Sequence, residues 1–274
     1  MSTVPTVPAG VPGALEPAVG ARVREVLRHV LVLTRRNLRR SVASPGQIID
    51  ATLMPVTLAV IFLYAFGGAI AGDSAQYRQY LIPGIMALTI TITCRTAGLA
   101  LHGDFASGMM DRYRSMPVAR SAALAARILA DAVRMLASQL IILAFGLLIG
   151  FRVHTGVLAA LAAVGIVLLY GMALCCLQAF IGLAARGIET VQSVSTLVMV
   201  PFQFGSSIFV APATMPGWLR LFVENNPMTA VVDCARALLT GGPVASSAAL
   251  AVAWSVGLIA VFAPLSVWKY RTHR

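Results

Sequence analysis

Lysine is nearly missing from this sequence of 274 residues, and its scarcity excludes one common nucleotide site. The single lysine, Lys269, is followed by Tyr270 close to the C-terminus. A phosphate-binding loop of the form GxxxxGK[ST] needs a lysine that reaches the nucleotide phosphates, followed by serine or threonine. The chain therefore has no such ATP site, and any ATP that it depends on must bind to another polypeptide.

Charged residues are also scarce. They make up 11% of the sequence against 58% hydrophobic residues, whereas an ordinary soluble domain has about 25% charged residues. The chain cannot cover its apolar surface with polar groups, so it belongs in a bilayer. The formal net charge is +11, but the arginines stand at the edges of apolar runs and not along one polar face. This pattern is typical of membrane topology and excludes a nucleic-acid-binding surface.

Motifs for metal binding and covalent catalysis are absent from the sequence. No HExxH or CxxC spacing occurs, and three of the four cysteines fall in apolar runs, where they are interpreted as packing residues. The pair Ser206-Ser207 lies in an apolar run, but no later run contains a histidine that would activate a serine nucleophile. We therefore expect no catalytic residue, no metal site and no cofactor bound by this chain. The histidines are scattered over different segments, at His29, His102, His154 and His273.

Six apolar runs are present instead, each near the ~20 residues that cross a hydrocarbon layer of ~30 Å. They predict an all-α integral membrane protein with six transmembrane helices. If the N-terminus is inside, most arginines fall in inner segments, and the positive-inside rule places both termini in the cytosol. The outer segments then hold only Arg78, Arg152, Arg220 and Arg236. The predicted spans are 48–70, 80–101, 128–151, 157–183, 191–210 and 244–268.

Two different segments precede the first span. Residues 1–20 contain four prolines among small residues and predict a disordered cytosolic leader, followed by a membrane domain over 45–274. Residues 21–44 combine helically spaced Val and Leu with arginines, which predicts a basic amphipathic helix on the inner leaflet. The alternative is a basic juxtamembrane tail that only sets orientation.

The longest polar interruption in the first half of the chain lies between the second and third spans. It runs from His102 to Arg120 and is charged and punctuated by Gly108 and Pro117. A loop that only reverses direction does not need this composition. The segment is therefore interpreted as a surface that the membrane protein offers to a soluble partner.

Several polar residues fall inside the spans, where a central charge costs roughly 2.5 to 3.5 kcal/mol and needs a partner. We expect Arg95 to pair with Asp131 or Asp50 in the bundle interior, with separate snorkelling of each charge to the inner headgroups as the alternative. For Arg134, snorkelling is the favoured interpretation. Hydrogen bonds between helices are expected at Gln139, Gln178, Gln192, Gln203, Ser195 and Thr196.

Residues 211–243 are too many for a plain loop and too polar for a span. Proline and glycine punctuate the segment, and two stretches around Trp218 and from Thr229 to Leu239 predict two short helices, the second with Asp233 and Arg236 on its polar side. They would dip into the outer leaflet as a lid over the last two spans. The alternative is an amphipathic connector that lies on the membrane surface.

Four motifs in this order resemble the type-2 ABC transporter permeases of the daunorubicin-resistance branch. The first is Gly108-x-x-Asp-Arg-Tyr-Arg-Ser-Met-Pro117-x-x-Arg120, and Arg127-x-x-x-Asp131 is the second. The third is Met215-Pro-Gly-Trp-Leu219, and the fourth is Asn226-Pro-x-Thr229 with Arg236 and Gly241-Gly242. The resemblance extends from about Arg35 to the C-terminus.

The resemblance implies a permease subunit that exports a hydrophobic or amphipathic drug or lipid by alternating access. ATP and magnesium would bind to a separate ABC ATPase subunit, and a second copy or a related permease would complete the pathway in a bacterial inner membrane. Arg95 departs from the family pattern, which has a small polar residue at this place, so the chemical class of the transported molecule stays open. The implied coupling residues are Asp104, Gly108, Asp111, Arg112, Arg114, Pro117 and Arg120, and the implied outer re-entrant residues are Pro216, Trp218, Asn226, Pro227 and Arg236.

Two other classes of protein stay open from the residues alone. One is a transporter or channel that works without ATP, which the scarcity of deep charges disfavours. The other is a membrane scaffold that recruits a soluble partner through its basic helix and its polar inner segment.

Overall fold

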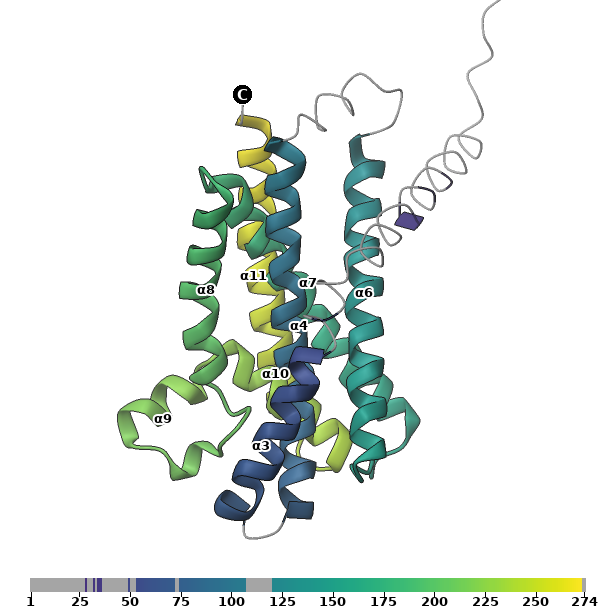
Figure 1. The fold of residues 1–274 in the computed structure, drawn as a ribbon, viewed down its shortest axis with the longest axis vertical. Helices are drawn as coiled ribbons and strands as arrows, with labels where there is room; N and C mark the ends of the chain where they lie inside the picture. Colours follow the sequence, from purple (N-terminus) through teal and green to yellow (C-terminus); the bar gives the residue numbers. More distant parts are fainter. Residues whose placement is uncertain are drawn as a thin grey trace, which may run out of the picture.

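The computed structural model describes residues 53–71, 74–106 and 120–272, together with single positions at 28, 32, 34, 35 and 49. These residues are helical or in short connections, and they contain no strand, which confirms the all-α class. The long helices are α3 (Met54–Ala71), α4 (Ser74–Ala106), α6 (Arg120–Leu148), α7 (Val157–Ala184), α8 (Ile188–Phe204) and α11 (Ala245–Thr272) (Figure 1). The short ones are η2 (Pro212–Thr214), α9 (Gly217–Glu224) and α10 (Pro227–Thr240).

Four of these helices are long and apolar enough to cross a membrane. The qualifying stretches are Ala75–Asp104, Arg127–Leu148, Val157–Ala184 and Ala245–Lys269. Helix α3 contributes a shorter apolar stretch, Met54–Ala65, and the 17 residues of α8 span about 25 Å. The protein is therefore a multi-pass membrane protein. The predicted fifth span extended to Val210, but the helix ends at Phe204, because the outer helices bind the backbone that follows it.

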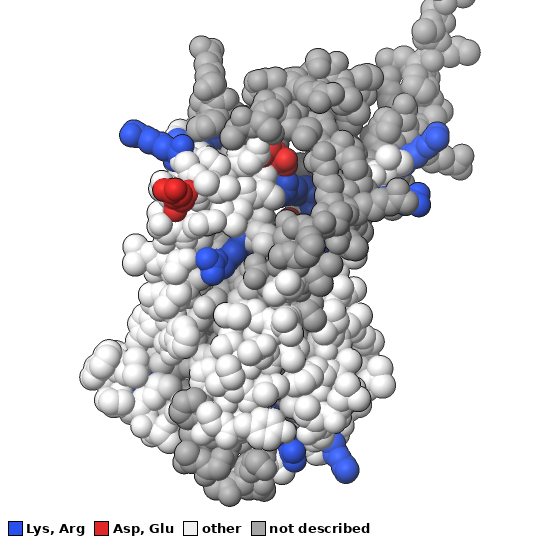
Figure 2. Space-filling view, viewed as in Figure 1, with Lys and Arg blue, Asp and Glu red and all other residues white. Residues whose placement is uncertain are grey.

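Helix α4 lies at the centre of the bundle. It packs against α3, α6, α7, α8 and α10, and a continuous stretch from Leu81 to Ile90 is buried on all sides. Figure 1 shows α9, α10 and the lower half of α3 at the end of the molecule opposite to the C-terminus. Figure 2 shows acidic and basic side chains gathered toward the C-terminal end and basic side chains at the other end, with a largely uncharged surface between them. This distribution fits a body embedded in lipid with two polar ends.

Glycine allows α4 and α7 to approach closely at one crossing. A Cβ atom at Gly182 would lie 2.4 Å from the carbonyl oxygen of Gly98, and one at Gly98 would lie 2.5 Å from that of Gln178. Both distances are too short for a real side chain, and the atoms in the way belong to the backbone. Small residues at helix contacts are typical of membrane bundles, where close backbone packing contributes much of the association energy.

Replacing Gly182 with alanine should therefore separate α4 from α7. We expect a loss of about 1–3 kcal/mol, the usual cost of overpacking, measured as a lower melting temperature of the purified protein in mild detergent. The matched control is Gly165→Ala on the same helix, because a Cβ there meets nothing within 4 Å. That control should be neutral or slightly stabilising, since alanine is the better helix former. Equal melting temperatures for the two variants would contradict this account of the crossing.

Candidate functional site

A network of ion pairs joins α4 to α6 where these helices border residues 107–119. The guanidinium of Arg127 donates a hydrogen bond of 2.7 Å to the carboxylate of Asp104 near the end of α4. A second nitrogen of Arg127 donates to the carbonyl oxygen of Ala97 at 3.3 Å, and its Nε lies 3.9 Å from Asp131. The ends of the two helices are thus held together by one arginine.

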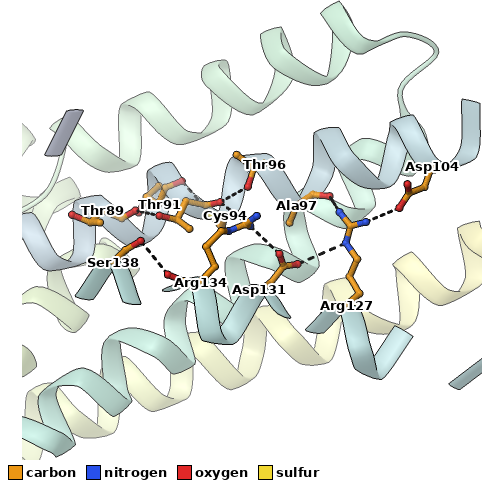
Figure 3. A network of polar contacts seen from close by, with 11 residues as sticks. Thr89, Thr91, Cys94, Thr96, Ala97, Asp104, Arg127, Asp131, Arg134 and Ser138 are labelled. Carbon is orange, nitrogen blue, oxygen red and sulfur yellow. Dashed lines mark hydrogen bonds and ion pairs between the residues drawn. The ribbon is translucent and has the colours of Figure 1, made fainter. Parts of the chain in front are cut away.

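The network continues one turn deeper, at Asp131. Arg134 donates to the Asp131 carboxylate at 2.8 Å and to the carbonyl oxygen of Thr93 at 3.4 Å (Figure 3). The side chains of Asp131 and Arg134 are 11% and 15% exposed, so this pair is largely withdrawn from solvent. Asp131 sits between two arginines on its own helix, at positions i−4 and i+3, which places all three on one face of α6. The network is a ladder of alternating charge that ties one face of α6 to the backbone of α4.

The structure corrects the prediction for Arg134 and one of the two partners predicted for Arg95. Arg134 does not snorkel alone but pairs with Asp131, and Arg95 does not pair with Asp131. Thr93 and Ala97 face α6, so Arg95, two residues from each, points about 200° away around α4. Arg95 instead donates to the hydroxyl of Thr196 on α8 at 2.9 Å. The alternative partner, Asp50, lies outside the described residues.

Of the predicted coupling residues, the structure describes the side chain of Asp104 alone. Arg120 begins α6, but its side chain is not described. The others, Gly108, Asp111, Arg112, Arg114 and Pro117, lie outside the described residues. Sequence reasoning missed the ion pair of Arg127 with Asp104. This pair joins α4 to α6, the two helices that border residues 107–119. The Arg127-x-x-x-Asp131 spacing indicated only the pair within α6, whose atoms are 3.9 Å apart.

A second polar site lies at the opposite end of the bundle, around Arg236 of α10. Its guanidinium donates to Asp233 at 2.6 Å, to the carbonyl oxygen of Ser207 at 2.9 Å and to that of Tyr80 at 3.3 Å. It also lies 3.8 Å above the centroid of the Tyr80 ring. The Ser207 hydroxyl donates to the same Asp233 oxygen at 2.8 Å, and the Tyr80 hydroxyl to the Ser207 carbonyl at 2.8 Å. One arginine thus links α10, α4 and the chain after α8.

Asn226 supports this site from the start of α10. Its side-chain oxygen accepts from the backbone N–H of Met228 at 2.9 Å, which caps the helix, and Pro227 takes the first helical position. Its amide nitrogen donates to the carbonyls of Phe202 and Gly205 at 2.9 and 2.6 Å. These carbonyls belong to the end of α8, so Asn226 joins the end of one helix to the beginning of another.

Residues 211–243 form the two predicted short helices, α9 and α10, and these lie in different environments. Pro216 precedes α9, on which Trp218 is 76% exposed. By contrast, α10 buries nine residues, and it packs against α4, α7 and α11. The alternative of a connector on the membrane surface is therefore wrong for α10. Its Asp-x-x-Arg spacing indicated the internal pair, whereas nothing in the sequence indicated the partners Tyr80 and Ser207.

Predicted hydrogen bonds between helices are confirmed at several positions. Gln139 of α6 donates to the carbonyl of Met86 on α4 at 2.9 Å, and Ser195 of α8 donates to Gln178 of α7 at 2.7 Å. Thr196 receives the bond from Arg95. In the part of the chain that the structure describes, no group of His, Cys, Asp or Glu side chains is arranged to hold a metal ion.

Comparisons with known proteins agree with this architecture. The chain is 34% identical over 265 residues to the daunorubicin resistance ABC transporter permease protein DrrB1 of Streptomyces coeruleorubidus, which covers 95% of this chain and 94% of the relative. It is 26% identical to the probable doxorubicin resistance ABC transporter permease protein DrrC of Mycobacterium tuberculosis, over 95% of this chain and 93% of the relative. A family model described as ABC-2 type transporter matches residues 28–240. The protein therefore belongs to the ABC-2 type transporter family, as a permease of an ABC transporter.

Proposed function

We propose that this chain moves a hydrophobic or amphipathic molecule, such as an antibiotic or a lipid-like compound, out of the cytosol by alternating access. The proposal rests on the relatives, whose names connect them with resistance to daunorubicin and doxorubicin, and on the largely apolar walls of the bundle. ATP would be hydrolysed by a separate ABC ATPase subunit, because this chain has no lysine placed for a phosphate-binding loop. The complex would lie in a bacterial inner membrane with both termini of this chain in the cytosol.

The observation that carries the proposal is the ladder between α4 and α6. Residues 104–117 would contain the coupling helix that seats in the ATPase, and α4 and α6, the helices on either side of it, are joined to each other by Arg127 and Asp104. A push on the segment would therefore move α4 and α6 together. Because α4 contacts most of the bundle, that movement reaches the remaining helices.

The remaining parts of the family architecture follow from this assignment. Helices α3 and α8 would be the first and fifth of six spans, and residues 21–44 would form the interfacial helix. Helices α9 and α10 would be the outer re-entrant pair, with the Arg236 site as their anchor to α4. A second permease copy or a related chain would complete the pathway, as the resemblance to this family implies.

Two substitutions in residues 104–117 test whether this segment transmits the movement of the ATPase to the spans. Gly108→Pro should disrupt the local backbone and Asp111→Arg should reverse a charge at the ATPase surface, so each is expected to reduce ATP-dependent export at least fivefold. Membrane insertion should be unchanged, because both residues lie outside the predicted spans. The measurement is export by proteoliposomes that contain this chain and the ATPase that co-purifies with it in mild detergent.

Two results would count against the proposal. Unchanged export from both variants would exclude residues 104–117 as the segment that transmits the movement of the ATPase to the spans. A well-folded preparation that brings down no ATPase would remove ATP-driven export altogether. The matched control is Arg220→Gln on α9, a charge change at an exposed ion pair of 2.6 Å at the other end of the bundle. It should leave both export and co-purification intact.

A further inference from the structure

Arg95 is a partly exposed charge within the span of α4, and its one hydrogen bond among the described residues is to a neutral group. It lies nine residues before Asp104 on the same helix, which places it about 13 Å from the polar end of the span. At that depth in a bilayer an arginine needs a partner that offsets its charge. Its contact in this structure is the Thr196 hydroxyl at 2.9 Å, through one of its five N–H groups.

The seam between α4, α7 and α8 holds a second donor without a partner. Gln178 of α7 is fully buried, its amide oxygen accepts from Ser195 of α8, and its amide nitrogen has no hydrogen-bond partner. Gln178 also packs against Gly98, one turn along α4 from Arg95. An unpaired buried amide costs free energy of about 1–3 kcal/mol, and few survive in native structures without a reason.

The seam is thus rich in hydrogen-bond donors and poor in acceptors. Both donors carry unused N–H groups, while the carboxylates of Asp104 and Asp131 are engaged by Arg127 and Arg134 on the opposite side of α4. An arginine in such a setting matches a carboxylate or phosphate, which its planar fork can bind through two parallel hydrogen bonds.

One edge of the seam is open. Helix α8 buries only the stripe Val191, Ser195, Met199 and Gln203, spaced every four residues, whereas Thr196 is exposed and Leu197 is 75% exposed. A molecule lying in the bilayer can therefore reach the Thr196 side of the seam with its head while its apolar part lies along α8.

We propose that Arg95, with Thr196 and Gln178, forms a recognition site for the acidic head, a carboxylate or phosphate, of an amphipathic molecule that enters between α4 and α8. The inference rests on the proposed function, because it names the chemical class of the cargo. An amphiphile with a cationic head is repelled by Arg95, and a neutral one leaves its charge without compensation. The inferred cargo of this chain therefore differs in charge from daunorubicin and doxorubicin, the amine-bearing drugs in the names of its relatives. The same acidic group is also found on the headgroups of anionic membrane lipids.

The test uses two photoreactive probes of equal length, a diazirine-bearing palmitic acid and the corresponding alcohol. The full-length chain, with the subunits that co-purify, is placed in phosphatidylcholine nanodiscs, and labelled peptides are mapped. We expect the acid to label α4 and α8 about tenfold more than the alcohol, since a hydrogen-bonded charge pair contributes on this scale. Arg95→Gln should lower acid labelling to the level of the alcohol, whereas Arg95→Lys should retain most of it. The control Arg152→Gln, at the outer end of the bundle, should change nothing.

The outcomes separate the sources of the ligand and the two proposals. If phosphatidylglycerol in the discs abolishes acid labelling, the occupant is a lipid headgroup; if labelling persists and ATP lowers it, the occupant is cargo. Equal labelling by acid and alcohol, or full acid labelling of a normally folded Arg95→Gln variant, would overturn the site. ATP-dependent export without charge-selective labelling would support the proposed function and reject the site at Arg95. Charge-selective labelling without any associated ATPase would support the site and reject ATP-driven export.

Discussion

Replacing Arg134 with methionine should destabilise the protein by about 3–5 kcal/mol, the range found when one partner of a buried ion pair is removed. Methionine matches the apolar stem of arginine and lacks the guanidinium, so the loss comes mainly from the charged group. It leaves the Asp131 carboxylate, whose side chain is 11% exposed, without its contact at 2.8 Å. Arg127 cannot replace that contact fully, because its Nε is 3.9 Å away and its other nitrogens bind Asp104 and Ala97. The melting temperature in detergent should fall by about 10 °C.

A double variant tests whether the unpaired charge of Asp131 causes the loss of stability. Asp131→Leu combined with Arg134→Met removes both charges and keeps the volume apolar, so it should restore most of the lost stability. The Arg127–Asp104 pair is left intact in the double variant and keeps the ends of α4 and α6 together. A double variant as unstable as the single one would show that Arg134 acts through its hydrogen bond to Thr93 or through packing.

The sequence predicted the class of fold and most of the helices because its apolar runs are long and well separated. The two short outer helices were also indicated, by Pro216, Asn226 and Pro227, whose preferences for helix starts are local properties of the chain. What it could not predict was the direction in which each side chain points. Arg95 and Asp131 are both charged and at similar depth, and only the rotation of α4 decides that Arg95 faces α8.

Sequence reasoning also could not predict the hydrogen bonds that side chains donate to backbone carbonyls. The carbonyls of Thr93, Ala97, Tyr80 and Ser207 accept from arginines across helix contacts, and every residue type has a carbonyl. Such contacts depend on how closely two helices approach. Gly98 and Gly182 permit a close approach of α4 and α7, but the pattern of polar and apolar residues does not indicate it. The early end of α8 has the same origin, because Asn226, distant in sequence, binds the carbonyls of Phe202 and Gly205 there.

Replacing Arg236 with methionine should have the other large effect on stability, about 2–4 kcal/mol, because hydrogen bonds from a charged group contribute about 1.5–3 kcal/mol each. The loss is smaller than for a fully buried pair, since the Asp233 side chain is 42% exposed. The side chain is 17% exposed and makes contacts to three parts of the chain that are far apart in sequence. Methionine fills part of the space, but it removes the ion pair with Asp233, one donor from each of the Tyr80 and Ser207 carbonyls, and the contact at 3.8 Å with the Tyr80 ring. Because these contacts hold α10 and the chain after α8 to α4, we expect limited proteolysis to cut between 205 and 226 first.

Two further variants separate the geometry of Arg236 from its charge. Arg236→Lys keeps the pair with Asp233 but cannot donate to two carbonyls in the same fork, so it should recover less than half of the lost stability. The matched control is Arg220→Met on α9, because the Arg220–Glu224 pair has the same distance of 2.6 Å but side chains that are 53% and 46% exposed. An exposed pair contributes about 0–1 kcal/mol, so this variant should melt within a few degrees of the unmodified protein. If Arg220→Met and Arg236→Met lowered the melting temperature equally, Arg236 would be a surface charge in solution and not the anchor of the outer helices.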